Sequence, residues 1–237
     1  DFSEGKIHAI MEDRDKNLWV GLFQKGIVLM PKQENPFEYY GNRSIYYNPI
    51  GQGCVMSIYQ DSNRHLGVGA DNEGIFELDA EGKRLRHYQP GNNPRSMANT
   101  IMCMYEDTNG DFWLGTYTRG LAKLNRRTGE CEYPLPVDNE KIFSITEDRH
   151  KNLYIATFGS GFYRYNLVTR ELKHYESSKD ESGDLTRNEL ANDWVNYIFC
   201  DSEGMIWLGH YKGISCFNPV NESFINYRNV NTLIEDR

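Results

Sequence analysis

The chain has 237 residues, 13% of them aromatic, with 21 glycines and a formal net charge of −8 at pH 7. This length suffices for one sizeable hydrophobic core. The acidic balance, with a sequence pI near 5.3, argues against nucleic-acid binding, which needs a surface rich in Lys and Arg. The sequence also contains no apolar run long enough to cross a membrane and no signal-peptide pattern.

One short motif recurs along the chain and sets the frame for the rest of it. Its best copy, EDTNGDFWLGT, occupies residues 106–116. The aspartates of five copies, separated by 48, 46, 41 and 53 residues, are Asp13, Asp61, Asp107, Asp148 and Asp201. Six residues after each aspartate the copies carry, in the same order, Trp19, Gly67, Trp113, Tyr154 and Trp207. A sixth copy opens at Asp236, so the chain is a repeat array.

The pattern inside each copy predicts one blade of a β-propeller. A period in the forties, punctuated by Asp, Gly and Trp, fits a four-stranded antiparallel blade. Apolar residues alternate before each Asp, as at Ile101, Cys103 and Tyr105, which predicts the innermost strand. The Asp carboxylate would then accept backbone N–H groups in a hairpin turn. The Trp or Tyr six residues later would fill the wedge between neighbouring blades.

In that turn we expect Gly or Asn to supply the left-handed residue. Gly110, Gly204, Asn17 and Asn152 meet this requirement, and His65 does not.

The predicted fold is all-β, with five four-stranded blades and one extra strand from a larger propeller of about seven blades. We expect residues 1–237 to form a single propeller region and to be an excerpt from a longer protein. Its repeat units would span approximately residues 5–50, 51–98, 99–139, 140–190 and 191–230, with a further unit starting at 231–237.

The repeat itself resembles a known family. The runs EDRDKNLWVGLFQKGI, EDTNGDFWLGTYTRGL and CDSEGMIWLGHYKGI are similar to two-component regulator propeller repeats, and so is the lead-in NNPRSMANTIMCMYED. The second copy departs from that pattern at Gly67, and the fourth departs at Tyr154 and Ala156. These departures affect the packing expected in those two blades and not the architecture. The resemblance covers essentially the whole chain.

The resemblance implies a function that composition does not. Proteins with this repeat are typically periplasmic sensor regions of hybrid two-component receptors in the inner membrane, where they respond to oligosaccharides from polysaccharide breakdown. The resemblance implies as partners a neighbouring propeller and an immunoglobulin-like module of the same receptor. An oligosaccharide ligand and a second copy in a homodimer are further hypotheses. A histidine kinase and a DNA-binding regulator would lie in other parts of the receptor. This segment itself would bind no nucleic acid.

Candidate ligand-binding residues come from the loops that differ between copies. If the strands run as predicted, the loops after the second and fourth strands of each blade share one face of the propeller. Rings beside charged and amide groups suit sugars, whose apolar faces stack on aromatic side chains. The residues of this kind are Tyr117, Arg119, Phe158, Trp194, Tyr211 and Lys212. Arg119 would offer a bidentate donor to a uronic acid or sulfate. Alternatively, these aromatic residues only cover the blade ends.

Titratable side chains give no sign of catalysis. Acidic pairs such as Glu106 and Asp107 recur with the repeat, which favours a structural role in the turn. The six histidines lack metal-ligand spacing, and the five cysteines lack a CxxC pattern, which predicts buried free thiols. We therefore expect no catalytic residue, no metal and no cofactor. The alternatives to a sensor are a structural or dimerisation propeller whose ligand binds elsewhere, and a propeller lyase or glycoside hydrolase.

Overall fold

The computed structural model describes residues 7–22, 26–30, 32, 39–41, 47–137, 140–178 and 188–227. Every regular element among them is a strand. None of these residues therefore forms a helix that could span a membrane. The chain divides into two compact units, Asp1–Tyr40 and Gly41–Arg237.

The first unit holds one antiparallel sheet of three strands in its described part. Its strands are β1 (Ile7–Glu12), β2 (Leu18–Leu22) and β3 (Gly26–Met30). A four-stranded blade requires a fourth strand after β3, and residues 33–38, which follow it, lie outside the described residues.

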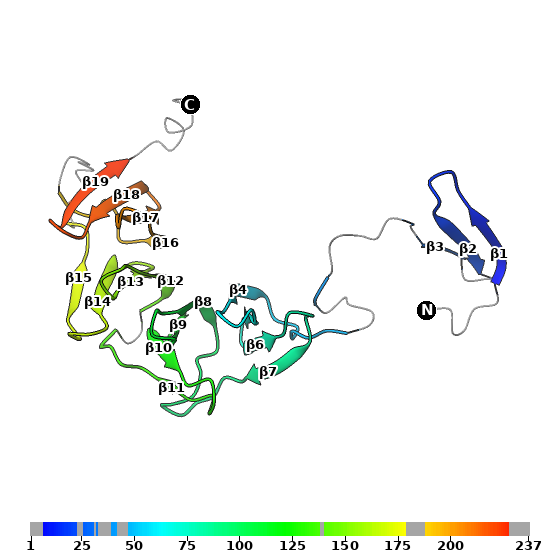
Figure 1. The fold of residues 1–237 in the computed structure, drawn as a ribbon, viewed down its shortest axis with the longest axis horizontal. Coiled ribbons are helices and arrows are strands. Elements are labelled where there is room, and N and C mark those ends of the chain that lie inside the picture. Colours follow the sequence, from blue (N-terminus) through cyan, green and yellow to red (C-terminus); the bar gives the residue numbers. More distant parts are fainter. Residues whose placement is uncertain are drawn as a thin grey trace. The chain divides into compact units, whose positions relative to one another are not determined.

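The second unit contains four antiparallel sheets, each built from four consecutive strands (Figure 1). The first sheet comprises β4 (Val55–Gln60), β5 (Leu66–Ala70), β6 (Gly74–Leu78) and β7 (Arg84–Tyr88). The second comprises β8 (Ile101–Glu106), β9 (Phe112–Thr116), β10 (Leu121–Leu124) and β11 (Cys131–Glu132). The third comprises β12 (Ile142–Glu147), β13 (Asn152–Thr157), β14 (Phe162–Asn166) and β15 (Leu172–Tyr175). The fourth comprises β16 (Val195–Cys200), β17 (Ile206–His210), β18 (Gly213–Asn218) and β19 (Ser223–Tyr227).

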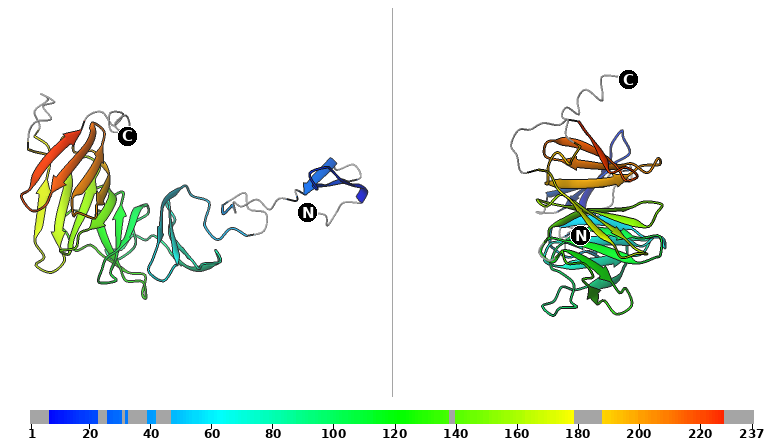
Figure 2. Two further views of the ribbon diagram at one scale, coloured as in Figure 1. Left: turned by 45° about the horizontal axis from the view of Figure 1, so that its top comes forward. Right: turned by 90° about the vertical axis from the view of Figure 1, so that its left-hand side faces the viewer.

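These sheets are propeller blades, as the repeat predicts. In this unit the strand before each Asp is the innermost, and β4 contacts β8, β8 contacts β12 and β12 contacts β16. Figure 2 shows the four sheets following one another in chain order, from cyan to red. The extra strand predicted at residues 231–237 lies outside the described residues.

The hydrophobic core lies between successive sheets. One cluster joins Trp113 of β9 to Ile142, Ile145 and Leu153 of the next sheet. Another joins Tyr154 of β13 to Ile198 and further residues of the last sheet. Trp113 is 1% exposed and Tyr154 is fully buried. Both rings therefore fill the wedge between blades, as the sequence predicts.

In the four copies that carry a ring six residues after the Asp, the Asp also holds that ring. The indole Nε1–H of Trp113 donates to Oδ2 of Asp107 at 2.8 Å. In the fourth copy the Tyr154 hydroxyl donates to Asp148 at 3.0 Å. Trp19 and Trp207 make the same bond to Asp13 and Asp201, at 2.8 and 2.7 Å. In both of these copies the indole bond is the main reason that the carboxyl pKa is lowered from its ordinary value.

The turn after the Asp differs from the prediction in one respect. Gly110 and Gly204 are left-handed as expected, but Asn17 and Asn152 are not. In those copies the left-handed residue is the preceding lysine, Lys16 with φ 68° and Lys151 with φ 64°. The second copy likewise uses Arg64.

The physical reason is a dense set of hydrogen bonds around the Asp. In the fourth copy Oδ1 of Asp148 accepts the backbone N–H groups of His150 and Asn152, at 2.8 and 3.0 Å. The Lys151 N–H donates to the carbonyl of Asp148 at 3.2 Å. These bonds hold Lys151, which has a Cβ atom, in the left-handed conformation that glycine adopts more easily. The Asn152 side chain instead donates to Oδ2 of Asp148 at 2.9 Å.

All five cysteines are free, but they are not uniformly buried. Cys131 and Cys216 are buried as expected, and Cys103 and Cys200 are partly buried, whereas Cys54 is exposed, which corrects the prediction for that residue. Burial raises the pKa of Cys103 to about 12 and that of Cys131 to about 11. These two thiols therefore stay protonated at neutral pH.

Candidate functional site

Three of the predicted ligand-binding residues meet at one edge of the last two sheets. Phe158 follows β13, Trp194 precedes β16 and Tyr211 follows β17. The ring centroids of Phe158 and Trp194 are 4.5 Å apart, and those of Trp194 and Tyr211 are 5.8 Å apart. Phe143 of β12 stacks on Phe158 at 4.8 Å. We call these four residues the aromatic row.

The two outer rings of the aromatic row remain open to solvent. Trp194 is 47% exposed and Tyr211 is 69% exposed. The planes of Trp194 and Tyr211 are nearly perpendicular, at 89°. Two accessible rings at this angle offer two stacking surfaces to one ligand, an arrangement suited to a sugar with several apolar faces.

Backbone contacts fix the loops that carry the row. Phe158 and Trp194 form an isolated antiparallel bridge. The carbonyl of Asp193 accepts the N–H groups of Gly159 and Gly161, both at 3.0 Å. Gly161 has φ 66°, and a Cβ atom there would lie 2.1 Å from the carbonyl oxygen of Tyr175. This tight approach to the end of β15 admits only glycine at position 161, while the bridge and the two bonds to Asp193 hold the two loops together.

Tyr117 lies on the neighbouring blade, in the loop after β9. It is 41% exposed, and the Lys141 ammonium lies 5.0 Å from its ring centroid. The carbonyl of Lys141 accepts the N–H of Phe158 at 2.9 Å. Lys141 therefore links Tyr117 to the aromatic row.

The structure gives Arg119 and Lys212 different surroundings. The Arg119 guanidinium donates to the carbonyls of Pro94 and Ser96, both at 2.8 Å, and lies 4.1 Å from the ring centroid of Tyr133. It holds the loop before β8, so an acidic sugar would have to compete with these contacts. Lys212 is exposed beside Tyr211. The sequence could not show that Arg119 is already engaged.

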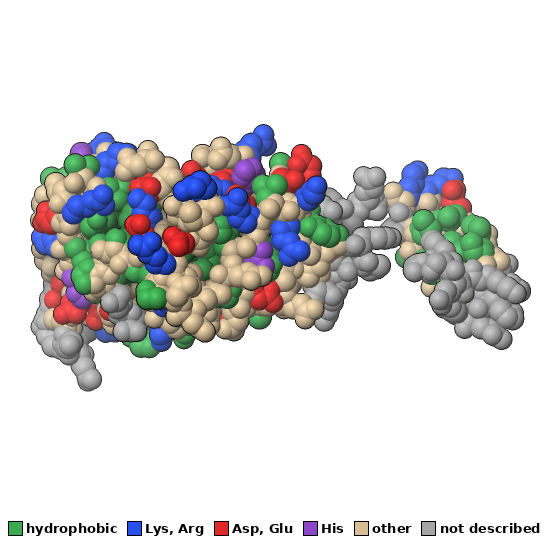
Figure 3. All heavy atoms as spheres, turned by 90° about the horizontal axis from the view of Figure 1, so that it is seen from below, with side chains coloured by type: hydrophobic (Ala, Val, Ile, Leu, Met, Phe, Trp, Pro, Cys, Tyr) green, Lys and Arg blue, Asp and Glu red, His purple; other side chains and the backbone are tan. Residues whose placement is uncertain are grey.

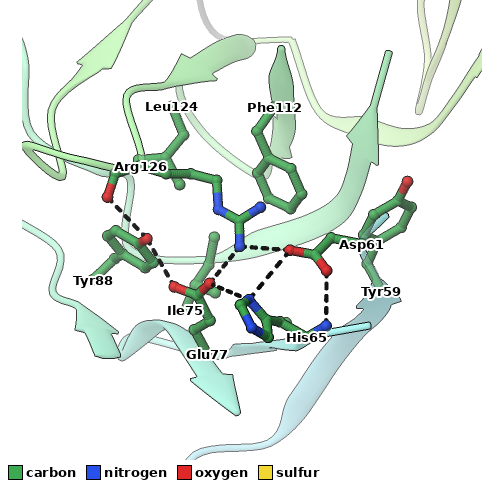
Figure 4. A pocket seen from close by; sticks show the side chains of 10 residues that line it. Tyr59, Asp61, His65, Ile75, Glu77, Tyr88, Phe112, Leu124 and Arg126 are labelled. Atoms are coloured by element: carbon green, nitrogen blue, oxygen red, sulfur yellow. Dashed lines mark hydrogen bonds and ion pairs between the residues drawn. The ribbon is translucent and has the colours of Figure 1, made fainter. Parts of the chain in front are cut away.

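A second, polar site lies between the first and second sheets of this unit, where Gly67 replaces the repeated Trp. Figure 4 shows the Arg126 guanidinium reaching into this position from the β10–β11 turn. One nitrogen of Arg126 lies 2.6 Å from Oδ2 of Asp61, the oxygen that accepts an indole N–H in other copies. The same nitrogen also pairs with Glu77. The arginine of the next blade thus replaces the missing ring as the partner of the repeated Asp.

The cluster around Arg126 is enclosed and mostly paired. The side chain of Asp61 is 3% exposed and that of Glu77 is 12% exposed. Burial would raise the pKa of Asp61, but hydrogen bonds from Arg126 and the His65 backbone outweigh it and lower that pKa. The pKa of Glu77 is lowered in the same way, by Arg126 and the Tyr88 hydroxyl, against burial. Both carboxylates therefore stay charged at neutral pH.

Three donor groups of this cluster could in principle hold a metal ion. Ligand atoms of Asp61, His65 and Glu77 lie within 4.8 Å of one another. However, the guanidinium of Arg126 already pairs with both carboxylates, so a metal would have to displace it. The arrangement fits an internal ion cluster better than a metal centre. Elsewhere on the surface shown in Figure 3, basic and acidic side chains interleave.

The polar cluster could not be found by scanning for site residues. The sequence marks this cluster only by the absence of a ring, because Gly67 lies where the other copies carry Trp or Tyr. The aromatic row had a positive signal, because Phe158, Trp194 and Tyr211 lie in loops that differ from copy to copy.

Comparison with known proteins matches two segments of the repeat array to a family model. The profile described as Two component regulator propeller matches residues 1–24 and 96–118. The curated Histidine kinase P4 of Formosa agariphila is 33% identical over an 82-residue alignment, and the match covers 30% of this chain and 6% of that protein.

Two solved structures show the fold. The extracellular domain of a hybrid two-component system of B. thetaiotaomicron matches with a TM-score of 0.75 at 23% identity, over 94% of this chain and 28% of that one. A streptogramin B lyase structure matches with a TM-score of 0.58 at 16% identity, over 96% of this chain and 70% of that one. The chain thus spans less than a third of the B. thetaiotaomicron structure and a small fraction of Histidine kinase P4.

Proposed function

Because the chain carries two-component regulator propeller repeats, we propose that it belongs to the extracytoplasmic sensor region of a hybrid two-component receptor. In this proposal the region lies in the periplasm as part of an inner-membrane receptor. Its aromatic row binds an oligosaccharide produced by polysaccharide breakdown, and a kinase elsewhere in the receptor carries the signal onward. Histidine kinase P4 and the extracellular domain from B. thetaiotaomicron support the receptor class.

The observation that carries the ligand proposal is the exposure of Trp194 and Tyr211 on a rigid base. Large exposed rings are costly to leave in water and frequently mark binding surfaces. Here Phe143 and Phe158 back the two rings, and paired loops fix them. Such preorganisation lowers the entropy lost when a ligand binds.

The test is a titration of the chain with a panel of neutral and acidic oligosaccharides, followed by calorimetry. We expect Trp194→Ala and Tyr211→Ala each to weaken binding of the best ligand by about tenfold or more, equivalent to at least ~1.4 kcal/mol. Tyr197→Ala is the matched control, because Tyr197 is 64% exposed on the same sheet but lies outside the row. Equal binding by all three variants would exclude the row as the ligand site.

A propeller lyase is the second candidate, because one matching structure is a lyase. At 16% identity that likeness concerns the fold alone. The same titration distinguishes the two functions if the oligosaccharide is recovered and analysed afterwards. Cleaved product would replace the sensor proposal, and intact ligand would support it.

A further inference from the structure

An open groove of about 350 Å³ lies beside the outer strand of the first sheet in the second unit. One wall comes from β7, through Arg86 and His87, and the other comes from the β10–β11 turn, through Arg127 and Thr128. No Asp or Glu is among the described residues that line it. Its size falls within the range of small-molecule sites. We call this groove, with an arginine on each wall, the basic groove.

The two arginines of the basic groove are exposed and keep their charge unpaired. Neither Arg86 nor Arg127 forms an ion pair with a carboxylate of the described residues. The Glu77 carboxylate, on the strand beside Arg86, already pairs with Arg126, and Glu130 of the turn pairs with another arginine at 3.8 Å. The groove is therefore a local concentration of positive charge in a chain whose net charge is −8.

Contacts with the backbone and with a ring hold both walls in place. Arg86 donates to a backbone carbonyl of the β10–β11 turn, and its guanidinium carbon lies 5.5 Å from the ring centroid of Tyr88. A guanidinium has five N–H donors, so most of them remain for a ligand. In the turn, Oδ1 of Asn125 accepts the N–H groups of Arg127 and Thr128, both at 3.1 Å. Walls fixed in this way lower the entropy lost on binding.

The repeat shows that the turn does not need an arginine. The turns between the third and fourth strands of the last three sheets each open with an Asn whose Oδ1 accepts the N–H two residues later. The residue that donates this N–H is Arg127 in the first of these turns, Val168 in the second and Val220 in the third. Both valines are largely exposed, at 74% and 90%. The same turn thus forms with an apolar residue that packs against little, and Arg127 is free to serve a ligand.

The strand position of Arg86 gives the same result when the three boundaries of this unit are compared. Arg86 lies opposite Glu77, and the equivalent residues of the next two sheets are Glu132 and Lys173. At the second boundary Glu132 is acidic and the turn carries Val168. At the third boundary Lys173 is paired with Glu222. Of the three boundaries that the structure describes, the first alone brings together two unpaired cations.

We propose that the basic groove is a second binding site, which takes a small ligand carrying a sulfate or phosphate group. Arg86 and Arg127 donate charge-assisted hydrogen bonds to the oxyanion, whose geometry suits the planar fork of a guanidinium. The Thr128 hydroxyl and the Gln89 amide, which also line the groove, are available to the rest of the ligand. None of these residues belongs to the aromatic row, so the site is independent of oligosaccharide binding there.

The test is calorimetric titration of the 237-residue chain with glucose 6-sulfate and glucose 6-phosphate, and separately with inorganic sulfate, inorganic phosphate and glucose. We expect Arg127→Val to weaken binding of the best oxyanion by about tenfold or more. Valine is chosen because Val168 and Val220 occupy the equivalent positions, so the variant should fold and melt as the wild type does. Arg149→Ala removes the same charge from an exposed arginine of another turn and should bind as the wild type does.

The probes also distinguish the sources of the oxyanion. Tighter binding of a sugar ester than of the inorganic ion identifies a sulfated or phosphorylated sugar as the ligand, and equal binding identifies the free ion; both outcomes support the site. Equal binding by the wild type and Arg127→Val would overturn the proposal. An equal loss in Arg149→Ala would also overturn it, because net charge would then account for the binding, and so would oxyanions that bind no better than glucose.

Discussion

At the scale of single residues, His210 shows how one buried side chain limits the pH range of the fold. Its Nδ1 accepts the Lys212 N–H at 3.2 Å, and its Nε2 lies 2.8 Å from the Ser215 hydroxyl, which donates onward to Asn226. The neutral ring with its proton on Nε2 satisfies both contacts. Burial, with a contribution from Lys212, lowers the pKa of His210 from 6.5 to about 4.

We predict that this histidine destabilises the fold in mild acid. Above pH 6.5 the ring is neutral in both folded and unfolded chains, so it carries no penalty. As the pH falls toward 4 only the unfolded chain takes up the proton, which lowers the free energy of unfolding by about 3 kcal/mol. Urea unfolding at pH 7 and pH 4.5 measures this loss. It should be smaller in His210→Gln, and the exposed His150→Gln should behave as the wild type does. Equal losses in all three proteins would contradict the assignment.

Residue chemistry also explains which parts of the turn could be predicted. The constant spacing of six between Asp107 and Trp113 located both the turn and the wedge ring. The identity of the left-handed residue could not be inferred from propensity, because hydrogen bonds to the Asp hold Lys16 and Lys151 there. The preference of Gly and Asn for a left-handed backbone did not decide this position, because the hydrogen bonds to the Asp form only in the folded turn.

At the scale of elements, charged side chains from one blade's outer turn hold the preceding blade. Arg126, between β10 and β11, pairs with Asp61 and Glu77. Glu222, between β18 and β19, pairs with Arg164 at 3.1 Å and with Lys173. Glu77 and Arg164 occupy equivalent positions, since Glu77 lies opposite Gly67 and Arg164 lies opposite Tyr154. The two boundaries therefore use the same geometry with the charges exchanged.

The two contacts should differ in strength because they differ in burial. Arg126→Ala would leave Asp61 and Glu77 enclosed without a cation, and we expect it to lower the free energy of unfolding by about 3–5 kcal/mol. Glu222→Ala would remove a carboxylate that is itself 35% exposed, and it would leave Lys173, 41% exposed, largely able to reach water. Arg164, which is 19% exposed, would keep its position over the Tyr175 ring. We expect that variant to lose about 1 kcal/mol or less. Denaturant titration of both variants checks the order, and an equal loss would show that burial does not set it.

The missing ring provides a sharper test of the Arg126 contact. If Arg126 replaces the repeated Trp, then Gly67→Trp alone should destabilise the chain, because ring and guanidinium would compete for Asp61. A Cβ atom on residue 67 would lie 3.1 Å from the flexible Met104 sulfur, so the position can accept a side chain with a small shift. We expect Gly67→Trp to restore part of the stability that Arg126→Ala loses. Thermal unfolding of the two single variants and the double variant measures this coupling, and simple additivity of the two losses would refute the replacement.

At the scale of the whole molecule, the second unit is a linear series of sheets in which each inner strand contacts the next. The repeat period predicted this series and the face on which the loops gather. It did not predict that Arg119 would be engaged with Pro94 and Ser96, because those contacts join segments from different parts of the chain. Sequence periodicity therefore fixes the architecture, while the partners of individual side chains depend on the packed loops.

A linear series should also unfold in parts when one boundary is weakened. The stability of such an array is roughly a sum of its units and of the interfaces between neighbours. Trp113 lies at the boundary between β8–β11 and β12–β15, where it packs with Ile142, Ile145 and Leu153. Trp113→Ala would remove this ring, leave a cavity and cost about 3–5 kcal/mol.

The predicted consequence is a loss of cooperativity, not only of stability. In Trp113→Ala, the backbone amides of β8–β11 should exchange hydrogen faster, while those of β16–β19 should change less. The last sheet keeps its contacts through Tyr154 and Ile198. Hydrogen exchange followed by mass spectrometry resolves the four sheets. Val220→Ala, at a residue 90% exposed in the last sheet's outer turn, is the control and should change neither. A uniform increase across all four sheets would show that the unit unfolds as a single cooperative body in spite of its nearest-neighbour construction.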